Sequence, residues 1–169
     1  MSVGIWDPGS LPAPLIGALE ASGWFRGRKA DVEAVIAELA AEGFRSNPYA
    51  ISFLEALSGL RIEPLTTAGP NFVNSEPLIV DPGGVGRKHR PEAEEVESAL
   101  GEQVFPVAWW LSYSYVYVTA SARMVAFSAG LIWLLGDAPG QGLDLAVRAS
   151  SRLTCIGSRA GQTPWPAPR

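Results

Sequence analysis

Apolar residues recur at helical spacing in the first third of the chain, and three of these runs end in the same way. Each run stops at a glycine that is followed at once by an apolar residue. A glycine readily takes the left-handed conformation that closes a helix, and the next side chain then folds back on the last turn. The pattern therefore predicts three amphipathic helices whose ends are also packing contacts, with Trp24 on Leu19, Phe44 on Leu39 and Leu60 on Leu54.

The starts of two of these helices are marked as well. Asp31 caps a run with apolar residues every three or four positions, and Asn47 precedes Pro48, a residue suited to a first helical turn. A helix with one apolar face needs another apolar layer to lie on. Such a layer is therefore expected further along the chain.

The segment from residue 104 to residue 122, VFPVAWWLSYSYVYVTASA, carries no charge. As a helix it would be long enough to span a bilayer. Pro106, the serines and the many Val, Tyr and Trp residues instead favour β-strands. At a spacing of two, one face of a strand presents Leu111, Tyr113, Tyr115 and Tyr117. We expect a sheet here rather than a membrane helix.

The remaining patterns place this segment in an α+β fold. Short strands are expected at LRIEPL and at residues 78–80, and DPGGVG after them is turn-like. An acidic helix, PEAEEVESAL, follows the basic run at 87–90, and further strands at 123–127 and LIWLLG continue an antiparallel meander. A final helix is expected from Gln141 to Leu153. We predict N-terminal helices packed on an antiparallel β-sheet with a C-terminal helix, as one domain over residues 1–157, and a flexible tail at 158–169.

Length, cysteine count and net charge limit the location and the partners that can be expected for this chain. A chain of 169 residues is enough for one core, and its single cysteine, Cys155, cannot form an internal disulfide. The N-terminus lacks a continuous apolar run because Asp7 and three prolines interrupt it, so a cytoplasmic location is expected. The formal charge of -4 argues against nucleic acid and anionic membranes and is compatible with a basic protein partner.

The sequence offers little catalytic chemistry. His89 is the one histidine and lies in a basic turn, so no zinc-ligand set of His and Cys and no nucleophile-histidine pair can be assembled. GPNF and DPGGVG lack the spacing of a phosphate loop. Cys155 has the setting of a small buried apolar residue. We therefore expect neither an enzyme nor a cofactor.

Three short boxes give the chain a family resemblance. The boxes combine helix ends with the entry into the sheet, and they occur in the same order as in the SUKH superfamily, most closely its third bacterial subgroup. Phe25, Ser58 and Ala108 depart from the family pattern. The resemblance covers residues 19–147 and is carried by Gly23, Trp24, Gly27, Arg28 and Asp31, then by Phe53, Leu54, Gly59 and Leu60, and then by Leu100, Gly101, Pro106 and Val107.

The resemblance implies an α+β domain that acts as an immunity protein. Such proteins bind a cognate bacterial polymorphic toxin, often a nuclease or a deaminase, and block its active site. Two alternatives stay open: a regulatory scaffold, since the superfamily also includes a yeast regulator of cell-wall synthesis, and a small enzyme. With a toxin as partner, and no direct nucleic acid or membrane contact, the residues that we expect at the contact are Glu92, Glu94, Glu95, Glu97, Trp109, Trp110, Tyr113 and Tyr115.

Overall fold

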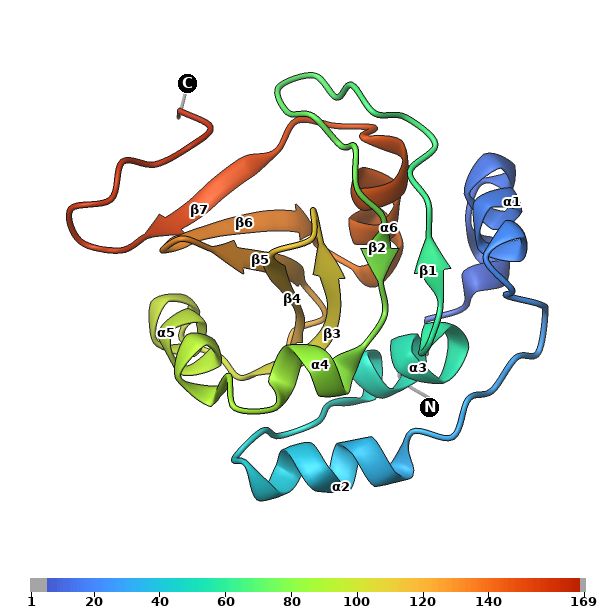
Figure 1. The fold of residues 1–169 in the computed structure, drawn as a ribbon, viewed down its shortest axis with the longest axis horizontal. Coiled ribbons are helices and arrows are strands. Elements are labelled where there is room, and N and C mark those ends of the chain that lie inside the picture. The colour runs from blue at the N-terminus through green and yellow to red at the C-terminus, as the bar shows by residue number, and fades with distance from the viewer. Residues whose placement is uncertain (1–5, 168–169) are drawn as a thin grey trace.

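The computed structural model describes residues 6–167 and shows helices around one antiparallel sheet (Figure 1). The sheet has seven strands in the order β1-β2-β3-β4-β5-β6-β7, so each strand pairs with its neighbours in sequence. The predicted α+β class is confirmed. The elements are the 3-10 helix Pro8–Ser10, α1 Ala13–Ala21, α2 Glu33–Ala41, α3 Pro48–Leu57, β1 Arg61–Ile62, β2 Leu78–Ile79, α4 Pro82–Gly86, α5 Arg90–Leu100, β3 Val104–Trp110, β4 Ser114–Thr119, β5 Met124–Ser128, β6 Leu131–Gly136, α6 Pro139–Arg148 and β7 Thr154–Ser158.

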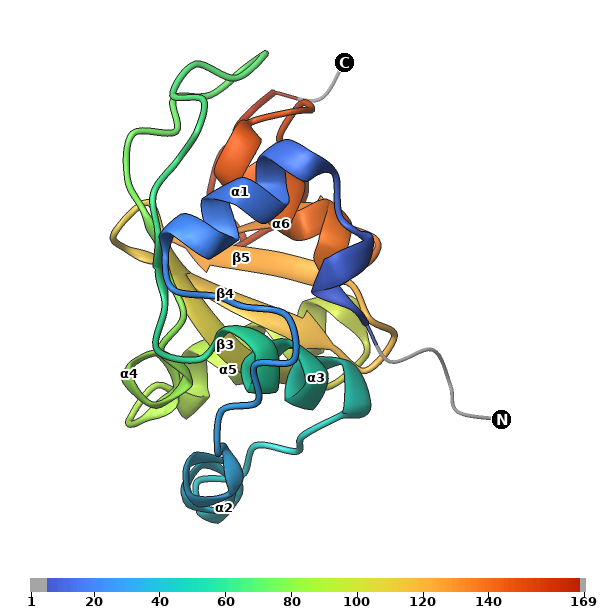
Figure 2. The same ribbon diagram turned by 90° about the vertical axis from the view of Figure 1, so that its right-hand side faces the viewer.

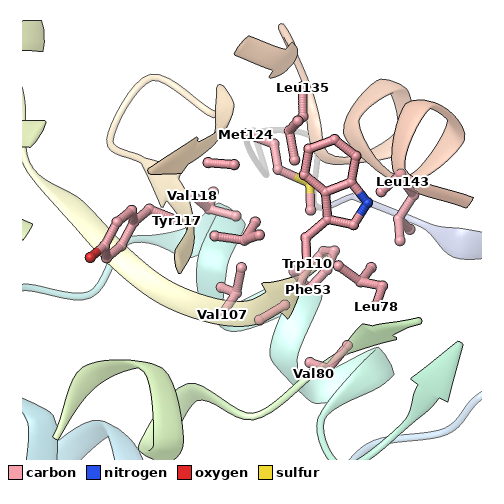
Figure 3. Close-up of a cluster of buried hydrophobic side chains, with 14 of the residues drawn as sticks. Phe53, Leu78, Val80, Val107, Trp110, Tyr117, Val118, Met124, Leu135 and Leu143 are labelled. Carbon is pink, nitrogen blue, oxygen red and sulfur yellow. The ribbon is translucent and has the colours of Figure 1, made fainter. Parts of the chain in front are cut away.

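Helices cover both faces of the sheet. Helix α6 packs on β5 and β6, and α1 lies beside α6 (Figure 2). Helices α3, α4 and α5 pack on β3, and α2 packs on α4. The core between α6, α3 and the sheet contains Phe53, Trp110, Met124 and Leu143, all fully buried (Figure 3). Figure 3 also shows Tyr117 pointing away from this cluster, toward the other face of the sheet.

Two of the three predicted helix ends have the expected geometry. The backbone N–H of Trp24 donates to the carbonyl of Leu19 at 2.9 Å, and Phe44 donates to Leu39 at 3.1 Å. The third end differs, because the Gly59 N–H donates to the Val80 carbonyl beyond β2 instead of closing on its own helix. Two carbonyls at this end accept from a distant side chain: the Arg28 guanidinium donates to the carbonyl of Ala56 at 2.6 Å and to that of Ser58 at 2.7 Å.

The tyrosine-rich segment is a hairpin rather than one strand. Strands β3 and β4 pair from Val104 opposite Thr119 to Trp110 opposite Ser114, and residues 111–113 form the turn. The prediction that Leu111 and Tyr113 share a strand face with Tyr115 is therefore wrong. Leu111 and Ser112 reverse the chain at φ 52° and 61°, without a glycine. None of the helices within residues 6–167 has the length and apolar character needed to cross a membrane.

The C-terminal helix is shorter than predicted. Helix α6 ends at Arg148 because Ala149 takes a left-handed conformation, φ 48°. Asn71 then holds Leu153 in an extended segment, accepting from its N–H at 2.8 Å and donating to its carbonyl at 2.9 Å. The chain continues as β7 on the edge of the sheet, a strand that the sequence reading missed.

Two further segments, DPGGVG and the C-terminal segment, concern predictions made from the sequence. DPGGVG forms the short helix α4 rather than a turn, and the Asp81 carboxylate caps it by accepting from the Gly84 N–H at 3.0 Å. In the C-terminal segment, the Trp133 indole donates to the Trp165 carbonyl at 2.7 Å. The domain limit at residue 157 and the flexibility of the tail stay predictions. Residues 1–5 of the predicted domain and residues 168–169 of the predicted tail lie outside the described part of the chain.

Glu102, in the connection from α5 to β3, predicts how stability depends on pH. Burial alone would raise the pKa of Glu102. Hydrogen bonds from Thr119, Arg123 and Ser121 outweigh this effect and lower the pKa to about 2. A pKa below the ordinary glutamate value stabilises the fold at neutral pH, and this contribution is lost as the pH falls from about 5 to about 2. Glu102→Gln is therefore expected to lower the free energy of unfolding by about 2 kcal/mol at pH 7, and by much less near pH 3.

Urea unfolding of both proteins at several pH values measures this difference. Glu63→Gln is the control, because Glu63 pairs with Arg61 while its side chain is 66% exposed, and it should cost little at any pH. A wild-type advantage over Glu102→Gln that stays constant between pH 7 and pH 3 would contradict the assignment.

Candidate partner-binding surface

Four glutamates of helix α5 are predicted to contact the partner, and two of them form ion pairs with arginines of this chain. The Arg90 guanidinium donates to both carboxylate oxygens of Glu97, at 2.8 and 3.0 Å, and the Glu97 side chain is only 16% exposed. The Arg159 guanidinium likewise donates to both carboxylate oxygens of Glu95, at 2.7 and 3.0 Å. Bidentate pairs fix both partners, so these two carboxylates are partly neutralised.

The other two glutamates, Glu92 and Glu94, have longer contacts with their ionic partners. Glu94 is 64% exposed and lies 3.6 Å from the Nε of Arg90, which already serves Glu97. Glu92 is one-third exposed and has His89 as its neighbour, with 3.6 Å between Nδ1 and Oε1. An imidazole is a cation only when it is protonated. Glu92 and Glu94 therefore supply the acidic character that remains on this helix.

Three aromatic rings lie beside the start of α5 and link it to β3 and β4. The ring centroids of Trp109 and Tyr115 are 5.0 Å apart, and those of His89 and Tyr115 are 5.1 Å apart. The Tyr115 hydroxyl and His89 Nδ1 are 3.3 Å apart, within hydrogen-bond reach. All three side chains are partly exposed. The structure thus brings Glu92, Trp109 and Tyr115 of the predicted set together.

Trp110 does not belong to a surface. It is fully buried, its indole N–H donates to the Asn74 side chain at 3.1 Å, and its ring packs edge-on to Phe72 and Trp133. Alternation along β3 turns Trp109 to one face and Trp110 to the other, so only one of the two adjacent tryptophans reaches the α5 side. Tyr113, in the turn, is 60% exposed.

Tyr117 belongs to the same cluster and was missed as a site residue. Its ring stacks with that of Tyr115 at 6.5 Å, and its hydroxyl is buried with no hydrogen-bond partner among the described residues. Burial, with the nearby Glu92 carboxylate, raises the pKa of Tyr117 far above its ordinary value, so the hydroxyl keeps its proton. The period-two pattern of the tyrosines was the signal that could have found it.

Within residues 6–167, no three His, Cys, Asp or Glu side chains are grouped so that they could hold a metal ion. A hollow of about 400 Å³ lies between β6 and α6, lined by Asp137, Asp144 and Arg152 among others. Neither His89 nor Cys155 lines it.

Comparison with known proteins places the chain in a family. A family model described as SUKH-3 immunity protein matches residues 11–145, which is most of the chain. No curated protein and no solved structure matches the chain. The matched range holds the three N-terminal helices, the acidic helix, the tyrosine hairpin and most of α6. The chain belongs to the SUKH-3 immunity protein family.

Proposed function

We propose that this protein neutralises a cognate protein toxin by binding the toxin domain and covering its active site, without turnover. The family match supports the immunity role, and the partly exposed aromatic and acidic cluster at the start of α5 supports a protein contact. Aromatic rings with polar edges are the residues that most often anchor protein interfaces. We further propose that the toxin is a nuclease or a deaminase and that neutralisation takes place in the cytoplasm.

Charge is the second support for this proposal. The chain carries a net charge of -4, and toxins that act on nucleic acid need a basic active-site face. A basic face meets carboxylates favourably, which mainly speeds association. We propose that the contact comprises Glu92, Glu94, Glu95, Glu97, Trp109, Tyr113 and Tyr115, with Trp110 removed from the predicted set because it is buried.

Co-expression tests the function directly. A candidate toxin domain encoded beside this protein should kill its host when expressed alone, and the host should survive when the two are expressed together. The two chains should co-purify, and toxin activity in vitro should fall as the protein is added. Survival without a physical complex would argue against occlusion, and death despite equal expression would argue against the proposed pair.

The acidic face makes a kinetic prediction. The double variant Glu94→Lys with Glu95→Lys is expected to slow association with the toxin about tenfold at low salt, because it replaces attraction by repulsion. The difference should shrink as salt screens it. Stopped-flow mixing or surface binding at several salt concentrations measures the rate.

A matched control separates local from net charge. Glu20→Lys with Glu63→Lys changes the net charge equally, and both residues are exposed. They lie on α1 and at the end of β1, on the opposite side of the molecule from α5 (Figure 1). Equal slowing by the two double variants would show that α5 does not face the toxin.

A pull-down distinguishes the alternatives. Recovery of a signalling or cell-wall enzyme complex instead of a toxin would favour the regulatory scaffold. The small enzyme has weaker support, since a reaction needs titratable groups gathered in a pocket, and the aromatic cluster lines none of five hollows among the described residues.

A further inference from the structure

The cluster at the start of α5 contains a carboxylate that the fold leaves without a strong partner. We name this set of residues the aromatic–carboxylate cluster: His89, Glu92, Trp109, Tyr115 and Tyr117. Helix α5 supplies Glu92, β3 supplies Trp109, and β4 supplies the two tyrosines. Residues distant in sequence thus converge on one small area of the α5 side of the sheet.

Two polar atoms of the cluster are unsatisfied. Glu92 Oε2 and the Tyr117 hydroxyl are both buried, and neither has a hydrogen-bond partner among the described residues. The Tyr117 side chain is fully buried. Buried polar atoms are paired in the great majority of folded proteins, because an unpaired one forfeits its hydration. The Glu92 side chain as a whole is still 34% exposed, so a group from outside can reach this carboxylate, whereas the Tyr117 hydroxyl is closed off by the fold.

The charge of Glu92 specifies what that group should be. Among the ion pairs of the described residues, Glu92 has only His89, whose Nδ1 also lies 3.3 Å from the Tyr115 hydroxyl. The permanent cation on the same helix, Arg90, is held by Glu97 and Glu94. A buried carboxylate oxygen favours a cationic donor, and the neighbouring Trp109 and Tyr115 rings favour a flat cation that can stack.

An arginine side chain meets both requirements. Its guanidinium is planar and stacks on aromatic rings while its N–H groups donate to a carboxylate, whereas a lysine ammonium is a compact, strongly hydrated charge. A metal ion is less suited, because Glu92 and His89 provide too few ligands.

We propose that the aromatic–carboxylate cluster is an anchor site for one arginine side chain of the protein partner. This inference rests on the proposed function only for the source of the arginine, since the site itself is built by this chain. The occupant pairs with Glu92 and stacks beside Trp109 and Tyr115. It would be the central contact of the interface, while Glu94 at the rim contributes to steering.

Binding of a free arginine derivative tests the site without the partner. The probe is N-acetyl-arginine amide, and N-acetyl-citrulline amide is its uncharged counterpart of the same shape. Two-dimensional NMR at constant ionic strength follows the indole N–H of Trp109, assigned with Trp109→Phe. Saturable shifts of Trp109 and of the amides at 89–92 are expected with arginine, and at least about tenfold weaker binding is expected with citrulline.

Two matched variants identify the carboxylate. Glu92→Gln is expected to weaken arginine binding by about tenfold, while Glu94→Gln, on the same helix but 64% exposed, should change it by less than about twofold. Thermal unfolding of both variants checks that the fold is retained. Equal effects of the two substitutions, equal binding of citrulline, or the absence of saturable shifts would overturn the proposal.

The outcome can be separated from that of the proposed function. If the toxin complex forms with unchanged affinity for Glu92→Gln, the anchor is wrong and the immunity role stands. If arginine binds in a Glu92-dependent way while no toxin is neutralised, the anchor stands and the proposed function fails.

Discussion

Asn74→Ala is expected to lower the free energy of unfolding by roughly 3 kcal/mol, a large effect for a loop residue. Asn74 is fully buried, and its amide joins three parts of the fold. Its Oδ1 accepts from the Trp110 indole at 3.1 Å, and its Nδ2 donates to the Ala146 carbonyl at 2.6 Å. That carbonyl is among the last of α6, where no helical N–H can reach it. Alanine would leave both groups buried and unpaired.

Asn71→Ala, in the same loop, is the matched control. Asn71 also makes two hydrogen bonds, both to the backbone of Leu153, but it is only partly buried, so water can replace it. A loss of about 1 kcal/mol is expected. Urea unfolding followed by circular dichroism measures both variants. If Asn74→Ala costs no more than Asn71→Ala, the buried amide does not hold the loop, β3 and α6 together.

The sequence predicted the features that depend on neighbouring residues. The helix ends at Gly23 and Gly43 follow from a glycine and the apolar residue after it, and the cap at Asn47 follows from a local hydrogen bond to the Ala50 N–H, 2.9 Å in the structure. The order of the other helices and strands also followed from local patterns, with α4 and β7 as exceptions. These rules need no knowledge of the rest of the fold.

Features set by distant contacts were not predictable in this way. The turn at Leu111 and Ser112 contains no glycine, proline or asparagine, so its local signal, from Ser112 alone, is weak. Strand β7 forms because β6 offers an edge, not because of its own pattern. The role of Asn74 likewise depends on Trp110 and Ala146, which are distant in sequence.

The candidate site divides along the same line. The alternation of the tyrosines and the acidic run on α5 pointed to the region where Glu92, Trp109 and Tyr115 lie together in the structure. Which glutamates are neutralised could not be read from the sequence, because the partner of Glu95 is Arg159, which is distant in sequence and follows the edge strand β7. Nor could the burial of Trp110 be separated from the exposure of Trp109 until the phase of β3 was known.

Gly142→Ala is expected to lower the free energy of unfolding by about 2 to 3 kcal/mol, although alanine is the better helix former. Helix α6 approaches β5 so closely that a Cβ on Gly142 would lie 2.7 Å from the Met124 Cβ and 2.8 Å from its Cγ. Met124 is fully buried among the residues of Figure 3, so it has no room to move. Relief requires α6 to shift away from the sheet.

Gly17→Ala is the opposite case and serves as the control. Gly17 lies inside α1, and apart from its chain neighbours and the backbone of its own helix no atom of the described residues lies within 4 Å of the position its Cβ would take. The same chemical change should therefore stabilise the protein by about 0.5 to 1 kcal/mol, through helix propensity alone. Parallel urea titrations of the two variants give the comparison. Because propensity is common to both substitutions, their difference isolates the contact between α6 and β5, and similar effects would show that this contact is not tight.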